Sequence, residues 1–141
     1  MSAAVSLITA SLLSSHAGYS HAAVVASGTR LVFLAGSCPV DLDGSTVAVG
    51  DVAGQARACI DNMAIALQAA GATISDVVST RILVASRDRE DLVLAWDIVR
   101  AAFGDHAVPS TLLGVTVLGY PDQLVEVEAV AAISVDSTLG S

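Results

Sequence analysis

The chain has 141 residues, the size of one domain, and its 54% of hydrophobic residues include so few aromatics (4%) that a core must be mainly aliphatic. Fourteen acidic residues against six arginines and no lysine give a net charge of −8, which excludes nucleic acid and anionic membranes as expected partners. No apolar run reaches the roughly 18 residues of a membrane span, and the N-terminus lacks the basic segment of a secretory signal, so a cytoplasmic location is expected.

The beginning of the chain predicts short strands joined by turns. Residues 1–17 carry no strong hydrophobic period and are expected to form an irregular N-terminal arm. Strands are predicted near 23–27 and 31–36, on either side of a turn that contains Gly28. A third short strand is predicted near 46–49, so three strands are expected before the first helix.

Two amphipathic helices are predicted from their end signals and their apolar stripes. The first begins after Asp51, a suitable N-cap, and ends before Gly71, which stands where a C-terminal glycine belongs. Its stripe consists of Val52, Ala56, Cys59, Met63, Ala66 and Ala70. The second helix begins after Ser86 or Asp88 and ends before Gly104. Its stripe consists of Leu92, Ala95, Trp96, Val99 and Phe103.

The remaining strands complete the predicted fold. A β-branched run over 76–85 predicts a mostly buried central strand between the helices, and two more strands are predicted near 110–118 and 124–134. The order β-β-β-α-β-α-β-β indicates an α+β fold, in which a six-stranded sheet carries both helices on one face. No linker or repeat divides residues 1–141, so a single domain is expected.

Alternation along the strands predicts what lies on the second face of that sheet. In the last strand Val125 and Val127 point one way, and Glu126 and Glu128 point the other. In the central strand Val78, Thr80, Ile82 and Val84 form one face, and Arg81 lies on the other. We expect the aliphatic sets to lie under the helices, which leaves the two glutamates and Arg81 on the opposite face. That face is then solvent, a cleft or a subunit interface. The surplus of apolar residues on a short chain favours an oligomer.

Common cofactor motifs are missing from the sequence. The three histidines are scattered with no metal-ligand spacing, and no phosphate-binding loop or dinucleotide fingerprint occurs, so neither a metal nor a cofactor is expected. Cys59 lies on the apolar stripe of the first helix and is expected in the core. Cys38 stands at a strand end and is a candidate to line a site.

Arg81 is the most informative charged residue, because a charge inside a β-branched run is costly unless it is paired. One interpretation is a structural ion pair with Glu126 or Glu128. The other is that its guanidinium binds the carboxylate of a substrate. Trp96 is open to two interpretations as well, and a core position is favoured over a ligand contact.

Several segments together resemble the Rid family (YjgF/YER057c/UK114, the reactive intermediate deaminases). The resemblance covers roughly residues 18–133 and rests on order and spacing. Its segments are Gly18-Tyr19, 31–36, 51–57, Asp61-Asn62-Met63, 69–72, 108–111 and 125–129. The resemblance implies a chorismate-mutase-like fold with a mixed sheet, and a homotrimer with clefts between subunits.

The resemblance also implies an activity. Family members hydrolyse enamine or imine intermediates such as 2-aminoacrylate to a 2-keto acid and ammonia without a cofactor. Tyr19 and Glu126 match the family's site, where the glutamate orients water. Three positions depart from the pattern: Thr111 stands where an arginine binds the substrate carboxylate, Ala35 where a serine is usual, and Trp96 where an asparagine is expected. The chain thus resembles a divergent subgroup that lacks the carboxylate-binding arginine.

The expected function is therefore a cofactor-independent hydrolase of the enamine/imine deaminase type. Its small-molecule substrate is expected to be altered, bulkier or less polar than 2-aminoacrylate, with Arg81, Thr111, Trp96, Ala35 and Cys38 as substrate-binding candidates. The alternative is a non-catalytic homotrimer of the same fold that binds a small metabolite or a protein. Ribonuclease activity is disfavoured by the net charge of −8 and the absence of lysine.

Overall fold

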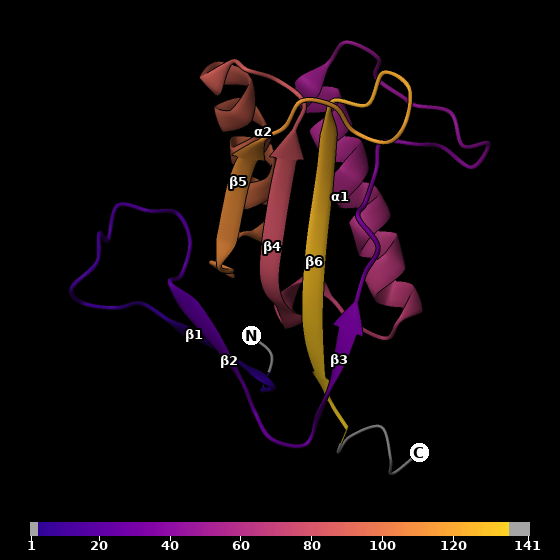
Figure 1. The fold of residues 1–141 in the computed structure, drawn as a ribbon. Helices are drawn as coiled ribbons and strands as arrows, with labels where there is room; N and C mark the ends of the chain where they lie inside the picture. The colour runs from indigo at the N-terminus through magenta and orange to yellow at the C-terminus, as the bar shows by residue number, and fades with distance from the viewer. Residues whose placement is uncertain (1–2, 136–141) are drawn as a thin grey trace.

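A four-stranded sheet with both helices on one of its faces forms the body of the protein (Figure 1). The structure is a computed structural model that describes residues 3–135. The strand order is β3-β6-β4-β5, in which β4 and β5 are parallel and the other neighbours are antiparallel. In chain order the elements are β1 (Val5–Ile8), β2 (Ala22–Val25), β3 (Thr29–Phe33), α1 (Val52–Ala69), the 3₁₀ turn Ile74–Asp76, β4 (Val77–Val84), α2 (Arg89–Phe103), β5 (Ser110–Gly114) and β6 (Val125–Ser134).

Strands β1 and β2 form a separate antiparallel ribbon and do not join the main sheet. The α+β class with two helices on one face is confirmed, but the six strands are divided into four and two. Strand β1 lies within the arm that is expected to be irregular. Four residues are too short to show a period in sequence, and their pairing depends on β2, where Val5 is the register partner of Val25.

The predicted strand near 46–49 is wrong. In that segment only a single bridge forms, between Val40 and Thr46. Ala48 and Gly50 have positive φ angles, 50° and 79°, and such a backbone cannot continue a pleated strand. The segment is instead a series of turns that leads into α1.

Both helices begin and end where the sequence predicts. The Asp51 carboxylate accepts a hydrogen bond from the backbone N–H of Gly54 at 3.0 Å, and Gly71 has a φ of 81° just beyond α1. At the start of α2 the hydroxyl of Ser86 accepts from the Asp88 N–H and donates to the carboxylate of Asp91. Ser86 therefore organises the helix start, although Asp88 is the residue at the cap position. Among residues 3–135, no helix combines the length and apolar character needed to cross a bilayer.

The aliphatic core lies between the helices and the sheet, and the predicted strand faces are largely confirmed. Val125 and Val127 are fully buried, whereas Glu126 and Glu128 are partly exposed on the opposite face, which we call the open face. The exception is Val78, which is predicted in the core. A register shift between Val77 and Ser79 turns Val77 into the core, and Val78 packs instead against the ribbon of β1 and β2. The ribbon thereby covers one end of the open face and leaves the Glu126 end uncovered.

Candidate functional site

A cavity of about 550 Å³ lies where the start of β5 meets α2 and the segment before β2. The rings of Tyr19 and Trp96 meet edge to face in its wall, with centroids 6.0 Å apart, and Thr111 lines the same space. The other lining residues are His16, Ala17, Gly18, Ser110 and Leu112. The structure thus brings together three of the residues singled out in the sequence. Trp96 also packs against the core, as the favoured interpretation expects, and its place in the cavity wall leaves the ligand contact as a prediction.

The polar side chains of this aromatic cavity are the imidazole of His16 and the hydroxyls of Tyr19, Ser110 and Thr111. Ser110 is occupied, because its hydroxyl contacts that of Thr80 at 2.6 Å and donates to the carbonyl of Val108 at 3.0 Å. The hydroxyls of Tyr19 and Thr111 form no hydrogen bond with any other of residues 3–135. No arginine lines the cavity. The free hydroxyls can therefore bind a polar group of a ligand, but they offer no charge for a carboxylate.

Glu126 lies near the start of β6 on the open face, and its carboxylate is held on one side. Its Oε1 accepts hydrogen bonds from the thiol of Cys38 at 3.1 Å and from the side-chain amide of Gln123 at 3.3 Å. Its Oε2 lies over Gly36, where an added Cβ would come within 2.5 Å. Ala35 precedes this glycine and is exposed. A side chain at position 36 would therefore displace the Glu126 carboxylate from its present place.

The two cysteines are protonated at neutral pH. Burial, followed by the hydrogen bond to Glu126 and the charge of that carboxylate, raises the pKa of Cys38 to about 11. Burial raises the pKa of Cys59 as well, and its thiol donates to the carbonyl of Val125 inside the core. Neither thiol is poised as a nucleophile, since the thiolate is the reactive form.

Arg81 forms an ion pair with Glu128, and its side chain is 56% exposed rather than mostly buried. The two residues are register partners across β4 and β6, with an Arg81 nitrogen 3.4 Å from a Glu128 oxygen. Glu126 is the diagonal neighbour of Arg81 on the same face, a relation that separates the two residues by about 7–8 Å. The structure therefore supports the structural ion pair with Glu128. It places Arg81 in a hollow beside that glutamate and not in the wall of the aromatic cavity.

Glu126 and the aromatic cavity belong to different parts of one protomer. Thr111 pairs with Arg81, which pairs with Glu128, so Thr111 lies two strands away from β6 and two residues out of register with Glu126. Strand spacing and rise place the Cα atoms of Glu126 and Thr111 on the order of 10 Å apart. Glu126 is not among the residues that line the aromatic cavity of its own protomer.

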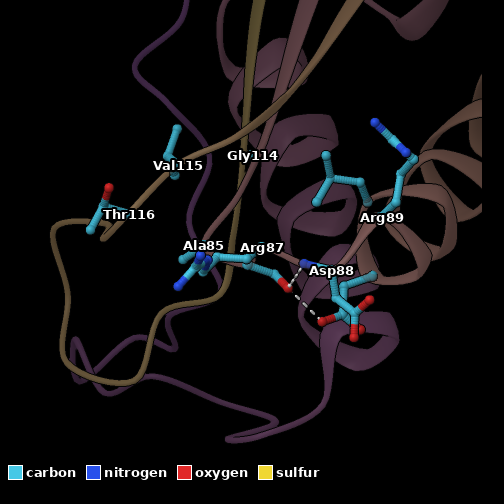
Figure 2. A pocket seen from close by; sticks show the side chains of 10 residues that line it. Ala85, Arg87, Asp88, Arg89, Gly114, Val115 and Thr116 are labelled. Carbon is cyan, nitrogen blue, oxygen red and sulfur yellow. Dashed lines mark hydrogen bonds between the residues drawn. The ribbon is translucent and has the colours of Figure 1, made fainter.

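A larger, open hollow of about 1310 Å³ lies at the carboxyl ends of β4 and β5, where α2 begins (Figure 2). Ser86, Asp88 and Asp91 form a hydrogen-bonded group in its wall. Arg87 and Arg89 line it too, but in Figure 2 their side chains lie on either side of this group and do not converge. This hollow contains none of the residues predicted for the site, and its polar groups do not form a common binding point.

Two of the three histidines, His21 and His106, have structural side-chain contacts in the described part of the chain. His106 is buried with its Nε2 2.7 Å from the carbonyl of Val77, and Nδ1 of His21 accepts from the N–H of Ala10 at 2.9 Å. No group of three His, Cys, Asp or Glu side chains within residues 3–135 is placed to hold a metal ion.

The structure adds residues that sequence reasoning does not find. Gln123 contacts Glu126 from the loop before β6, and the side-chain amide of Asn62 donates to the carbonyls of Cys38 and Val40. His16 lines the aromatic cavity from the arm. Asn62 lies within a segment that carries the family resemblance, whereas nothing in the spacing of the other two distinguishes them from surface residues.

The fold places the protein in the class of small α+β proteins whose sheet carries both helices on one face. Its site features are an accessible glutamate on a strand and an aromatic cavity beside α2. Within that class, the chain belongs to the Endoribonuclease L-PSP family, the family of the YjgF/Rid/UK114 proteins, whose model matches residues 9–133. A RutC family protein of Pyrococcus abyssi is 30% identical over 72% of this chain and 78% of its own.

Solved structures agree with this membership. A Rid family protein of unknown function from Yersinia pestis is 27% identical, with a TM-score of 0.84 over 92% of this chain and 99% of its own. A YjgF/YER057c/UK114 family member from Mycobacterium tuberculosis is 32% identical with a TM-score of 0.62 over the same shares. The chain is thus similar in fold and length to whole members of the family.

Proposed function

We propose that this protein is a cofactor-independent hydrolase of imines or enamines that acts on a small metabolite with an apolar substituent. The observation that supports this most is Glu126, a carboxylate on a strand that carries the family resemblance, with one oxygen that accepts no hydrogen bond from residues 3–135. Membership in the Rid family supplies the reaction class. The aromatic cavity favours a substrate that differs from 2-aminoacrylate, because Thr111 cannot form a charge-assisted bond to a carboxylate.

The reaction needs only a positioned water and a base. The imine carbon is already electrophilic, and Glu126 takes a proton from water as the oxygen adds to that carbon; the protonated glutamate then gives this proton to the nitrogen. The tetrahedral adduct then loses ammonia as its C–N bond breaks, and its hydroxyl gives up a proton to leave a carbonyl product. One imine and one water thus yield one carbonyl compound and one ammonia. The walls formed by Tyr19 and Trp96 suit an apolar body.

We also propose a homotrimer whose clefts between subunits unite the two parts of the site. The separation of Glu126 from the aromatic cavity supports this, since a partner copy can bring its own glutamate, or its own cavity, to the other. Exposed apolar side chains on the uncovered part of the open face support it as well. Phe33 is 73% exposed there, and its register partner is Val130 on β6.

The experiment generates imines in solution with an amine oxidase acting on an aromatic amine, and measures how fast the carbonyl product and ammonia appear with and without the protein. We expect acceleration by the wild type and loss of it in Glu126→Gln, which keeps the shape and removes the base. Glu128→Gln is the matched control on the same strand and should behave as the wild type. Equal rates with and without wild-type protein would reject the proposal.

The alternative, a non-catalytic homotrimer that binds a small metabolite or a protein, draws on one observation, the neutral Thr111 in the position of the family's arginine. It predicts that the aromatic amine or its carbonyl product binds the wild type, measured by quenching of the single tryptophan. It also predicts no acceleration of imine hydrolysis, so the two functions are separated by the same samples.

A further inference from the structure

The two oxygens of the Glu126 carboxylate differ in their surroundings. Oε1 accepts two hydrogen bonds, from the Cys38 thiol at 3.1 Å and from the Gln123 amide at 3.3 Å. Oε2 accepts none from residues 3–135, and within this part of the chain no buried side-chain oxygen or nitrogen lacks a partner. Oε2 is therefore open to solvent, above Gly36, whose missing side chain leaves room for it.

Both donors are themselves held in place. Gln123 is 4% exposed, its amide nitrogen also donates to the carbonyl of Val125, and its oxygen accepts from the N–H of Tyr120. The backbone beside the thiol is fixed by Asn62, whose amide donates to the carbonyl of Cys38 at 2.8 Å. Donors that are already ordered orient a carboxylate without further loss of side-chain entropy.

We propose that Cys38 and Gln123 are positioning residues for Glu126, which hold Oε1 so that Oε2 is the atom that accepts the proton of the attacking water. This inference rests on the proposed hydrolysis and extends it to two residues outside the aromatic cavity. A carboxylate free to rotate presents either oxygen in many orientations, whereas one with an anchored oxygen keeps the other at a fixed point.

The thiol suits this role because it keeps its proton. Burial and the neighbouring carboxylate raise the pKa of Cys38 to about 11, so it remains a donor throughout the neutral range. Alkylation of the Cys38 sulfur would remove this hydrogen-bond donor, so the reactivity of the thiol is a probe of the contact. The other cysteine, Cys59, is completely buried in the core, so Cys38 is the more accessible of the two thiols.

The first test measures the contact itself and needs no substrate. Wild type and Glu126→Gln are treated with iodoacetamide at pH 8, and alkylation of Cys38 is followed by mass spectrometry. Loss of the negative charge should lower the pKa of the thiol and speed its alkylation severalfold, since the thiolate is the reactive form. Glu128→Gln is the matched control and should react like the wild type. Equal rates for Glu126→Gln and wild type would overturn the proposed contact.

The second test measures the positioning role in the imine assay. Cys38→Ala should lower kcat about tenfold with KM little changed, as expected for a lost hydrogen bond to a charged group. Cys38→Ser, whose hydroxyl keeps the donor, should recover most of that loss. A wild-type kcat in Cys38→Ala would overturn the positioning role alone. A wild type without any hydrolysis, whatever its alkylation rate, would overturn the proposed function and the positioning role together.

Discussion

The ion pair of Arg81 contributes less to stability than the sequence context of this arginine suggests. An arginine in a β-branched run predicts a costly buried charge, yet its side chain is more than half exposed, and Glu128 is 39% exposed. Pairs this accessible contribute about 0–1 kcal/mol, because water and salt screen the attraction. Arg81 thus forms an exposed ion pair on the open face of the sheet and adds little to stability.

We accordingly expect Arg81→Met to change the free energy of unfolding by less than about 1 kcal/mol. Urea denaturation of the wild type, Arg81→Met, Glu128→Gln and the double variant gives the coupling energy of the pair directly. The same Arg81→Met protein should hydrolyse apolar imines as the wild type does. A loss of several kcal/mol, or a selective loss of ligand binding with the fold intact, would restore the functional interpretation of Arg81.

Thr111 governs a second prediction at this scale. Thr111→Arg should introduce into the aromatic cavity the charge that the family uses for carboxylates. Such a bond is worth about 1.5–3 kcal/mol, so kcat/KM for imines formed from amino acids should rise by about tenfold or more relative to imines formed from amines. An arginine placed elsewhere on β5 or α2 should not have this effect, and Leu94→Arg on α2 is a suitable control because Leu94 is exposed. An unchanged preference would show that Thr111 does not face the substrate.

At the scale of elements, α1 stabilises the sheet through one of its faces. Met63 is fully buried against the sheet, whereas Ile65, two residues further along, is 66% exposed. Met63→Ala should therefore cost about 2–5 kcal/mol of unfolding free energy through lost transfer energy and a new cavity. Ile65→Ala should cost less than about 1 kcal/mol, because alanine is a good helix former and little packing is lost. Thermal unfolding of both variants checks the contrast, and similar losses would contradict this orientation of the helix.

The helices were predictable from sequence because their signals are local. Asp51, Gly71 and Gly104 mark ends within one turn of the residues they cap, and the stripes repeat along most of each helix. Strand β1 was not predictable, since its only support is a pairing with residues far along the chain. The register shift at Val77 escaped prediction for the same reason: strict alternation in sequence cannot show where a partner strand slips.

The residues of the candidate site also differ in whether the sequence alone identifies them. Tyr19, Trp96, Thr111 and Glu126 could be marked from the resemblance, residue by residue. The contact between Cys38 and Glu126 joins positions 88 residues apart, and neither composition nor spacing brings a thiol to a particular oxygen. Gln123 carries no signal at all before the loop that precedes β6 is seen in three dimensions.

The whole molecule is acidic but has an uncovered apolar area. The ribbon of β1 and β2 shields the open face at the C-terminal end of β6, and the edge strand β3 beside this end of β6 presents Phe33 and Leu31, which are 73% and 51% exposed (Figure 1). With a net charge of −8, copies of the chain repel one another unless a specific contact compensates. An edge strand with large apolar side chains is a feature that soluble monomers usually avoid.

We therefore predict that the protein is a closed homotrimer of about 43 kDa, three times the 14.2 kDa of the chain. Light scattering coupled to size exclusion measures this mass at micromolar concentration. Phe33→Asp places a charge on the open face and should shift the mass toward the monomer. It should also abolish imine hydrolysis, because Glu126 would lose the cavity of its partner. Leu42→Asp is the matched control, since Leu42 is fully exposed in the turn after residue 40 and should leave mass and activity unchanged. A wild-type monomer that hydrolyses imines would refute the shared site, whereas an inactive trimer would leave the assembly intact and favour the binding module.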